Sequence, residues 1–327
     1  MEQNCFSQDH LVLSAQYTET MEKIVIPYLE DHRENQEVTG TGGKQLFCSV
    51  FHAEHPNGNV LFVHGFTENV YKFSEIIYSL LKNGFNVLAY DQRGHGRSWR
   101  DETISDISLT HVDHFGEYIQ DMEIIMNQKA SCLTGPWMVF SHSMGGAVTS
   151  LYMEKHPEVF SRAVFCAPMI QPNTGMPQAV VRIMCGMMRI LGRRKSRVFI
   201  SKPYLEKEVF EESSATSRER FDWYEEMRMQ HREYQNNGPT YGWTMEAMNV
   251  TKQILAPGEP EKITCPVKLY TAEKDAMVLP EAQKAFIDRV KQGSFLFVKD
   301  ARHEIYRSED AVLFPWWHDV LQFLQGK

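Results

Sequence analysis

The most constraining feature of the sequence is a short apolar run, Met138–Phe140, that ends in small and polar residues and passes at once into a helix-compatible run, Ala147–Lys155. This order predicts a strand, a tight turn and a helix. A turn of this kind lifts a serine hydroxyl clear of the sheet and leaves the next backbone N–H free to bind an oxyanion. Ser143 is the serine so placed, and Met144 carries the free N–H.

The turn also requires small residues two positions on either side of Ser143, because strand and helix pass close together there. Gly145 meets this requirement on the far side, whereas Ser141 stands on the near side, where the pattern has glycine. Because serine is small, we expect the turn to tolerate Ser141. Taken alone, the stretch is also compatible with an ordinary strand followed by a polar loop.

Strand and helix patterns alternate along much of the chain, which is typical of an α/β fold with a mostly parallel sheet covered by helices on both faces. A chain of 327 residues with 43% hydrophobic content can bury such a core as one large domain with an insertion. Strands are predicted at 45–51, 59–63, 85–90, 137–140, 161–166, 265–271 and 294–298, with a hairpin-type turn at 57–58. Helices are predicted at 17–29, 73–81, 112–126, 280–290 and 309–324.

The alternation stops between about Met169 and Ile254, where helical patterns dominate and no strand is evident. Folds of this class often place such an insertion over the active site. We therefore divide the chain into an N-terminal leader segment (1–43), a first part of the core (44–168), a helical cap (169–254) and a second part of the core (255–327).

A serine hydroxyl is a poor nucleophile until a base takes its proton, so an exposed serine requires partners elsewhere in the chain. The expected chain order is serine, acid, histidine, each in a loop at the C-terminal end of a strand. Ser143, Asp275 and His303 satisfy this order. His303 would act as base and then as acid, while Asp275 would fix the imidazole tautomer.

The second oxyanion donor is predicted from the loop that follows the strand 59–63. That loop begins with His64-Gly65, and the backbone N–H of the next residue, Phe66, would act together with that of Met144. By itself, His-Gly at a strand end also fits an ordinary strand-to-helix turn.

Four other residues compete for the acid and base positions. Asp300 lies on the same loop as His303, and Glu273 precedes Asp275 by two residues, but spacing after the strand favours Asp275. His318 falls inside the last helix and is interpreted as structural. His95 lies in the glycine-rich loop 91–98, which we interpret as held by ion pairs rather than as catalytic.

Composition limits the class of partner and the cellular location. The formal charge of −8 argues against nucleic acid as a partner, and the six scattered cysteines form no close pair typical of a zinc or redox site. The first residues, 1–4, carry no basic region, and no uncharged apolar run approaches the roughly 18 to 20 residues of a membrane span. We therefore expect a cytoplasmic protein, and peripheral contact with the inner face of the membrane remains open.

The cap has a distinctive composition. Nine of the 17 methionines fall between Met169 and Met248, which suits either a flexible apolar groove for a lipid chain or simple helical packing. The cap also carries a basic cluster in an acidic protein. Its members are Arg182, Arg189, Arg193, Arg194, Lys195 and Arg197. The cluster predicts either transient contact with anionic lipid or a solvated helix face.

The motifs resemble those of the monoacylglycerol lipase and lysophospholipase group of α/β-hydrolases, and within it the bacterial lysophospholipase branch of the L-two type. The resemblance covers the chain from about residue 17 to 324. The motifs that carry it are His64–Glu68, Asp91–Ser98, Phe115–Asp121, His142–Gly146 and Ala301–Glu304, with Thr216–Arg220 and Gly238–Trp243 in the cap. Ser141, in place of the usual glycine, is the main departure.

The resemblance implies an α/β-hydrolase fold and a serine hydrolase that cleaves a single-chain lipid ester, a lysophospholipid or a monoacylglycerol, through an acyl-enzyme. No metal or other cofactor is expected, because His303 would activate the water. Two alternatives remain open: a peptidase or amidase similar to proline iminopeptidases, and a catalytically silent protein that binds a hydrophobic ligand. The oligomeric state is not predicted.

Overall fold

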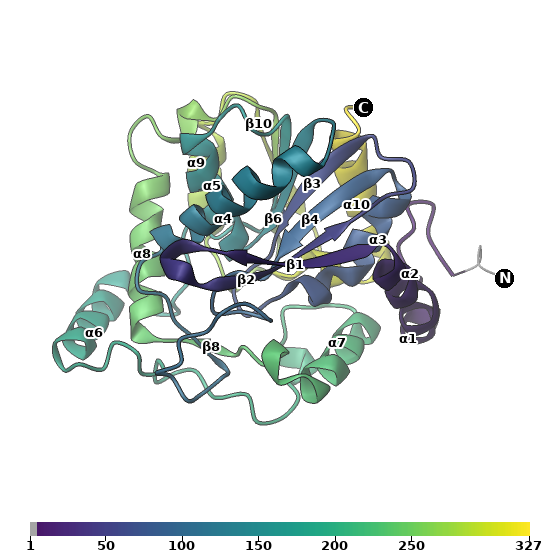
Figure 1. Cartoon of the computed structure of the whole chain (residues 1–327). Coiled ribbons are helices and arrows are strands. Elements are labelled where there is room, and N and C mark those ends of the chain that lie inside the picture. The colour runs from purple at the N-terminus through teal and green to yellow at the C-terminus, as the bar shows by residue number, and fades with distance from the viewer. Residues whose placement is uncertain (1–4) are drawn as a thin grey trace.

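The computed structural model describes residues 5–327 and contains a twisted eight-stranded sheet between layers of helices (Figure 1). Residues 1–4, on which the expected lack of a signal peptide partly rests, lie outside the described residues. The strands in sheet order are β1 (Arg33–Thr39), β2 (Gln45–Phe51), β4 (Phe85–Tyr90), β3 (Gly58–Val63), β6 (Trp137–His142), β7 (Arg162–Cys166), β9 (Val267–Ala272) and β10 (Gly293–Val298).

All pairings from β4 through β3, β6, β7 and β9 to β10 are parallel, whereas β1 and β2 are antiparallel to their neighbours. The prediction of a mostly parallel sheet flanked by helices is therefore confirmed. Parallel strands covered on both faces must be apolar along their whole length, and every residue of β3, β4 and β6 is buried.

Alternate residues of each strand enter opposite cores. In β3, Leu61 and Val63 join one buried cluster, while Val60 and Phe62 join the other. The first cluster is covered by helices α4 (Gly116–Lys129), α5 (Met144–Lys155), α8 (Tyr241–Ile254) and α9 (Pro280–Ile287). The second is covered mainly by α1 (Tyr17–Thr20), α2 (Ile26–Asp31), α3 (Ser74–Lys82) and α10 (Asp310–Leu324).

Two features of the N-terminal part differ from the sequence-based expectation. A strand, β1, forms at residues 33–39 and pairs with β2, although its polar sequence gave no strand signal. The hairpin at 57–58 is wrong, because β4 lies between β2 and β3 in the sheet. The partner of β2 is decided by tertiary pairing, which a local turn signal does not reveal. The predicted helix at 17–29 is present as one continuous helical segment over residues 17–31.

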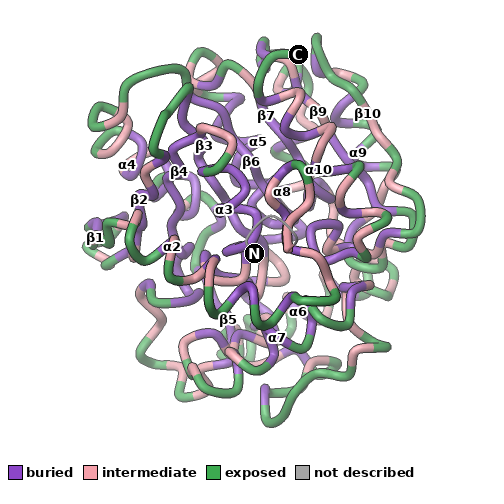
Figure 2. Tube along the Cα trace, turned by 90° about the vertical axis from the view of Figure 1, so that its right-hand side faces the viewer, coloured by how far each residue is buried: buried purple, intermediate pink, exposed green. Residues whose placement is uncertain are grey.

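The segment between β7 and β9 contains α6 (Gln178–Ile190), α7 (Arg218–Gln230), the two-residue strand β8 (Gly238–Pro239) and α8. The first three lie together on one side of the sheet (Figure 1). Exposed residues are frequent at that end of the molecule (Figure 2). Strand β8 pairs with β5 (Leu109–Thr110), while α8 packs on α5 and α7 contacts α1. The segment is thus attached to the sheet domain through several elements.

Candidate active site

Ser143 occupies a strained turn between β6 and α5. Its backbone has φ 48° and ψ −118°, a conformation that a side-chain-bearing residue adopts only when the surroundings enforce it. The Ser143 N–H donates to Cys166 O at 3.1 Å, and Ser143 O accepts from Met169 N at 2.8 Å. These bonds fix the turn from the neighbouring β7 side.

The two small residues around the turn behave differently. A Cβ at Gly145 would lie 2.3 Å from Val63 O, so only glycine lets α5 approach β3 this closely. Ser141 is fully buried, and its hydroxyl donates to Val164 O of β7 at 3.4 Å. The departure at position 141 is therefore accommodated as a hydrogen bond to the adjacent strand.

The structure brings Ser143, Asp275 and His303 together, although they are far apart in the chain. His303 Nε2 lies 2.8 Å from Ser143 Oγ, and His303 Nδ1 lies 2.8 Å from Asp275 Oδ2. Asp275 Oδ1 accepts the backbone N–H groups of Met277 at 2.8 Å and Val278 at 3.2 Å. The imidazole is therefore held between the hydroxyl and a fixed carboxylate.

The pKa values of the two ionisable groups move apart. Burial alone would lower the pKa of His303, but the negative charge of Asp275 and its hydrogen bond outweigh burial and raise that pKa. Burial would likewise raise the pKa of Asp275, but His303 and the two backbone donors lower it. Asp275 is thus ionised at neutral pH, where a proton arriving at His303 is stabilised.

Two backbone N–H groups are available beside Ser143. Among the hydrogen bonds of residues 5–327, none uses the N–H of Phe66 or of Met144. The His64 ring Nδ1 lies 2.8 Å from Gly65 O, while His64 Nε2 accepts from Gln92 N at 2.9 Å, so Nδ1 carries the proton. Because the peptide unit is planar and trans, this contact turns the N–H of Phe66 away from His64.

The competing residues have other partners. Asp300 pairs with Lys274 at 2.9 Å, and Glu273 accepts the Asp300 N–H. His318, which belongs to α10, lies with its Nδ1 3.0 Å from Asp9 Oδ2. Their hydrogen bonds therefore place all three outside the group around Ser143.

His95 is fully buried, and its Nδ1 contacts the carbonyl oxygen of Arg93 at 3.0 Å. In the same loop, Arg93 pairs with Asp121 at 2.6 Å, as an ion-paired structural loop requires. Asp91 instead accepts backbone N–H groups of residues 70 and 97. The loop is thus held by one buried ion pair and by a carboxylate that caps backbone donors.

A cavity of about 300 Å³ opens onto Ser143. Its lining is apolar or neutral, and it includes Met169, Met176 and Met184, with Trp243 packed 4.0 Å from the Phe66 ring. A volume of this size is at the lower end of the range for small-molecule sites. None of the cavity-lining residues carries a charge.

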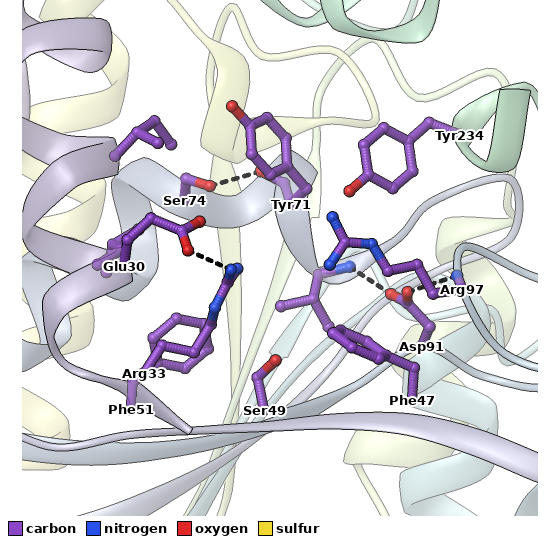
Figure 3. Close-up of a pocket in the computed structure, with 13 residues that line it drawn as sticks. Glu30, Arg33, Phe47, Ser49, Phe51, Tyr71, Ser74, Asp91, Arg97 and Tyr234 are labelled. Carbon is purple, nitrogen blue, oxygen red and sulfur yellow. Dashed lines mark hydrogen bonds and ion pairs between the residues drawn. The ribbon is translucent and has the colours of Figure 1, made fainter. Parts of the chain in front are cut away.

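A second pocket, shown in Figure 3, lies away from this site between α2, β2 and Tyr234 of the segment between β7 and β9. Its volume is about 20 Å³, roughly the space of one water molecule. Arg33 is paired there with Glu30, and Asp91 accepts two backbone N–H groups. Ser143 does not line it, and the guanidinium of Arg97, which also lines it, lies over the rings of Phe47 and Tyr234.

Sequence reasoning missed a buried charged group behind Ser143. The Glu68 carboxylate contacts His142, Lys72 and Tyr306, and Lys72 also pairs with Glu304 at 2.6 Å. All five residues stand inside or next to the recognised motifs, but the motifs gave no indication that these charges meet. Pairing across loops is decided only by the fold.

Most members of the basic cluster at residues 182–197 form internal contacts. Arg194 pairs with Asp113, Lys195 with Asp101 and Arg197 with Asp106, and Arg182 donates to Asn249. Arg189 and Arg193 are the two exposed members for which the described residues provide no ion pair. The cluster is therefore a smaller positive patch than its sequence suggested.

No helix within residues 5–327 is long and apolar enough to cross a bilayer. In the same residues, no group of three or more His, Cys, Asp or Glu side chains is arranged to hold a metal ion.

Comparison with protein families gives a match to serine aminopeptidase, S33, over residues 54–310. Lysophospholipase L2 of Escherichia coli strain K12 is 29% identical over 302 residues, which cover 89% of this chain and 87% of that protein. Monoacylglycerol lipase of Mycolicibacterium smegmatis is 26% identical over 163 residues, covering 49% of this chain and 54% of the relative.

Solved structures share the fold. A soluble variant of monoglyceride lipase from Saccharomyces cerevisiae, in complex with a substrate analogue, has a TM-score of 0.69 at 19% identity, covering 90% of this chain and 96% of that one. A carboxyl esterase from Bacillus coagulans has a TM-score of 0.72 at 15% identity, covering 90% and 98%. At these identities the likeness concerns the α/β-hydrolase architecture.

Proposed function

The chain belongs to the serine aminopeptidase S33 family of hydrolases, and within this family we propose that it is a serine hydrolase that cleaves the carboxylic ester of a single-chain lipid. The observation that carries the proposal is the uncharged, methionine-rich cavity that opens onto a serine hydroxyl in contact with a histidine–aspartate pair.

In the first half of the reaction, Ser143 Oγ attacks the ester carbonyl carbon while His303 Nε2 takes the hydroxyl proton. Asp275 holds the imidazole orientation and stabilises the imidazolium that forms. The tetrahedral intermediate then collapses, and His303 returns the proton to the departing alcohol. The products of this half are a free alcohol headgroup and an acyl-enzyme on Ser143.

The N–H groups of Phe66 and Met144 would bind the oxyanion that develops on the carbonyl oxygen. Each such donor is commonly worth about 3 kcal/mol of transition-state stabilisation. In the second half, His303 takes a proton from water, the resulting hydroxide attacks the acyl carbon, and Ser143 leaves with the proton. The fatty acid is released and the enzyme is restored.

The cavity favours a lipid ester over the peptide that the family description mentions. An aminopeptidase needs an anionic group to hold the substrate α-amino group, and the cavity-lining residues include no Asp or Glu. Flexible methionines instead suit an alkyl chain that bends. The names of the relatives, lysophospholipase L2 and monoacylglycerol lipase, agree with this substrate class.

A substrate panel tests the proposal. We expect hydrolysis of lysophosphatidylcholine and monoolein, with little cleavage of proline anilide, and complete loss of hydrolysis in Ser143→Ala. Ser141→Gly is the matched control, because it changes the neighbouring serine without removing the nucleophile. Preference for the anilide would overturn the substrate class, and retained turnover in Ser143→Ala would overturn the mechanism.

Residues 169–254 are proposed to act as a cap that docks on the surface of a membrane. Helix α6 exposes an apolar face consisting of Val180, Ile183, Met187 and Ile190, the last 87% exposed. Ile200 lines the cavity and is also 60% exposed, so apolar surface continues from the outside into the site. An exposed apolar helix face next to a lipid cavity suits uptake of a single-chain lipid from a bilayer.

Liposome flotation tests this contact. The double variant Ile183→Ser/Ile190→Ser should bind liposomes at least about tenfold more weakly. Burial of one exposed isoleucine side chain contributes about 1.5–3 kcal/mol to the free energy of binding. Phe297→Ser, which removes an exposed aromatic ring from the edge strand β10, is the matched control and should bind normally. Arg189→Glu/Arg193→Glu should weaken binding only to anionic liposomes. Unchanged binding of the isoleucine variant would exclude the α6 face as the docking surface.

A further inference from the structure

A further cavity, of about 220 Å³, lies between α6 and α8. Gly186 and Arg189 of α6 line it, together with Tyr241, Glu246 and Asn249 of α8. It shares no lining residue with the cavity that opens onto Ser143, which other positions of the same two helices line. At about 30 Å³ per water molecule, its volume is that of roughly seven waters. This α6–α8 pocket therefore suits a small polar group better than a lipid chain.

Arg189 brings to the α6–α8 pocket a positive charge that no carboxylate neutralises. Arg194, which also lines the pocket, pairs with Asp113 at 2.9 Å. Arg189 has no such partner among residues 5–327 and is exposed. A guanidinium group binds a phosphate through two parallel N–H donors. Arg189 is thus suited to hold an anionic phosphate group.

Asn249 is oriented so that its amide donors are free. Its Oδ1 accepts from Arg182 Nη1 at 2.6 Å, and the Nη2 of the same guanidinium donates to Met248 O at 2.8 Å. Because arginine only donates, the oxygen of the Asn249 amide must face Arg182. The two N–H donors of that amide have no acceptor within residues 5–327. They are therefore available to an anion in the pocket.

Glu246 offers the opposite chemistry in the same pocket. Its Oε2 accepts the Phe115 N–H at 2.9 Å, whereas its Oε1 has no hydrogen-bond partner in the part of the chain that the structure describes. A carboxylate oxygen repels a phosphate but is a strong acceptor for a hydroxyl group. A ligand that satisfies both Arg189 and Glu246 must therefore carry an anionic group and a hydroxyl donor.

The charge around the α6–α8 pocket is positive in excess. The arginines that line or adjoin it outnumber the carboxylates. The arginines are Arg182, Arg189, Arg193 and Arg194, and the acidic residues are Asp113 and Glu246. His114 also lines the pocket. An anion is thus favoured over a cation as the ligand.

We propose that the α6–α8 pocket binds the headgroup of an anionic phospholipid whose phosphate is esterified with a hydroxylated alcohol such as glycerol. Arg189 and the Asn249 amide hold the phosphate oxygens, and Glu246 Oε1 accepts from the headgroup hydroxyls. The inference rests on the proposed function, because it names the lipid that the proposed membrane contact of residues 169–254 selects.

The position of Gly186 favours a lipid over a free phosphate ester. Gly186 is three residues from Ile183 and four from Ile190, so these positions are neighbours on the surface of α6. A Cβ at Gly186 would meet nothing within 4 Å, so this wall of the pocket is open. Ile183 and Ile190 are 65% and 87% exposed. A lipid whose headgroup occupies the pocket can therefore keep its chains in the apolar layer that these side chains would enter.

Vesicles of equal charge test the choice of headgroup. Flotation compares phosphatidylcholine vesicles that contain the same fraction of either phosphatidylglycerol or phosphatidylethanol, two lipids with the same single negative charge. Only phosphatidylglycerol has headgroup hydroxyls. The wild type should bind its vesicles about tenfold more tightly, as one hydrogen bond to a charged group provides. Equal binding to the two kinds of vesicle overturns the proposal.

Glu246→Gln separates a headgroup site from a general positive patch. The glutamine keeps an oxygen for the Phe115 N–H and removes one negative charge. A general positive patch would then bind both kinds of anionic vesicle more tightly, with an unchanged ratio. We expect instead that the preference for phosphatidylglycerol falls to about threefold or less, because a neutral acceptor forms a weaker hydrogen bond. An unchanged ratio in a folded variant overturns the proposal.

Arg189→Gln and Arg193→Gln form a matched pair. Each removes one positive charge from the same surface, but only Arg189 lines the pocket. Both variants should bind anionic vesicles more weakly than the wild type. The preference for phosphatidylglycerol should be lost in Arg189→Gln and retained in Arg193→Gln. The same preference in both variants overturns the proposal.

Free glycerol 3-phosphate distinguishes the lipid from a soluble phosphate ester that carries the same groups. Its dissociation constant, measured by isothermal titration calorimetry, should be at least about tenfold higher than the value per accessible phosphatidylglycerol in vesicles, because it lacks the chains that add apolar contact. Equal or tighter binding of the free compound overturns the lipid assignment.

Labelling of Ser143 by a fluorophosphonate without vesicles keeps this inference apart from the proposed hydrolysis. Labelling should be equal in the wild type, Glu246→Gln and Arg189→Gln, because the two cavities share no lining residue. If the wild type is not labelled, the proposed hydrolysis fails and the vesicle comparison still decides this inference. If the wild type is labelled but shows no preference for phosphatidylglycerol, this inference alone fails. Circular dichroism verifies the folding of each variant, and the wild-type comparison needs no variant.

Discussion

Replacing Gly145 by alanine should destabilise the protein, whereas the same replacement at Gly186 should stabilise it. Both glycines lie within helices, α5 and α6, where alanine is favoured over glycine by about 1 kcal/mol. A Cβ at Gly145 would lie 2.3 Å from Val63 O and 2.7 Å from His64 O. A Cβ at Gly186 would meet nothing within 4 Å. The variants share the gain in helix propensity and differ only in the available space.

The magnitude follows from the obstacle. Real Cβ atoms essentially never approach another heavy atom more closely than 3.0 Å, so α5 and β3 would have to separate by at least about 0.7 Å. The obstructing atoms are backbone, which cannot rotate away. Overpacking of this kind costs about 1–3 kcal/mol or more. After the gain in helix propensity, we expect the free energy of unfolding to fall by about 2 kcal/mol for Gly145→Ala and to rise by about 1 kcal/mol for Gly186→Ala.

Urea denaturation followed by tryptophan fluorescence measures both changes. Because α5 begins directly after Ser143, its displacement should also slow fluorophosphonate labelling in Gly145→Ala and leave labelling of Gly186→Ala unchanged. Equal stability of the two variants would refute the close-approach argument, since helix propensity alone predicts no difference between them.

Three further changes have defined outcomes. Asp275→Asn should reduce kcat/KM by about 10⁴-fold. It should also shift the acid limb of the pH profile of kcat/KM to lower pH, because activity requires neutral His303 and the Asp275 carboxylate raises the pKa of His303. Ser141→Gly should leave activity near wild type and lower the free energy of unfolding by about 1 kcal/mol, through loss of a long hydrogen bond and added backbone freedom, as measured by urea denaturation. Arg220→Met should lower that free energy by about 3–5 kcal/mol, because buried Glu75 would lose its ionic partner at 2.9 Å; a loss below about 1 kcal/mol would contradict this.

Much of the fold could be predicted because its signals are local. Strands such as β3, β4 and β6 are continuous apolar runs, and the helices that follow show buried faces at helical spacing. The edge strand β1 escaped prediction because an exposed edge needs no apolar pattern, and it is held by backbone pairing to β2. The order of β2, β4 and β3 likewise depends on pairing between distant segments.

Part of the candidate site could be predicted from the sequence for a related reason. Parallel strands end at the same edge of a sheet, so residues that follow different strands, such as Asp275 and His303, can be expected to meet there. The structure places His303 between the other two residues, in hydrogen-bond contact with Asp275 through one ring nitrogen and with Ser143 through the other. The pairing of the cations at residues 182–197 could not be predicted in this way, because Arg194 and Lys195 pair with acidic residues that are distant in the sequence.

The sequence by itself determined the strand–turn–helix around Ser143, the order of the chemical groups and the helical character of residues 169–254, because each is encoded in residue type and local spacing. Only the tertiary structure decided which charges face one another. A carboxylate such as Glu68 can be a surface charge or the buried partner of His142, and the difference depends on loops that meet only after folding. Burial then strengthens that interaction, since water no longer screens it.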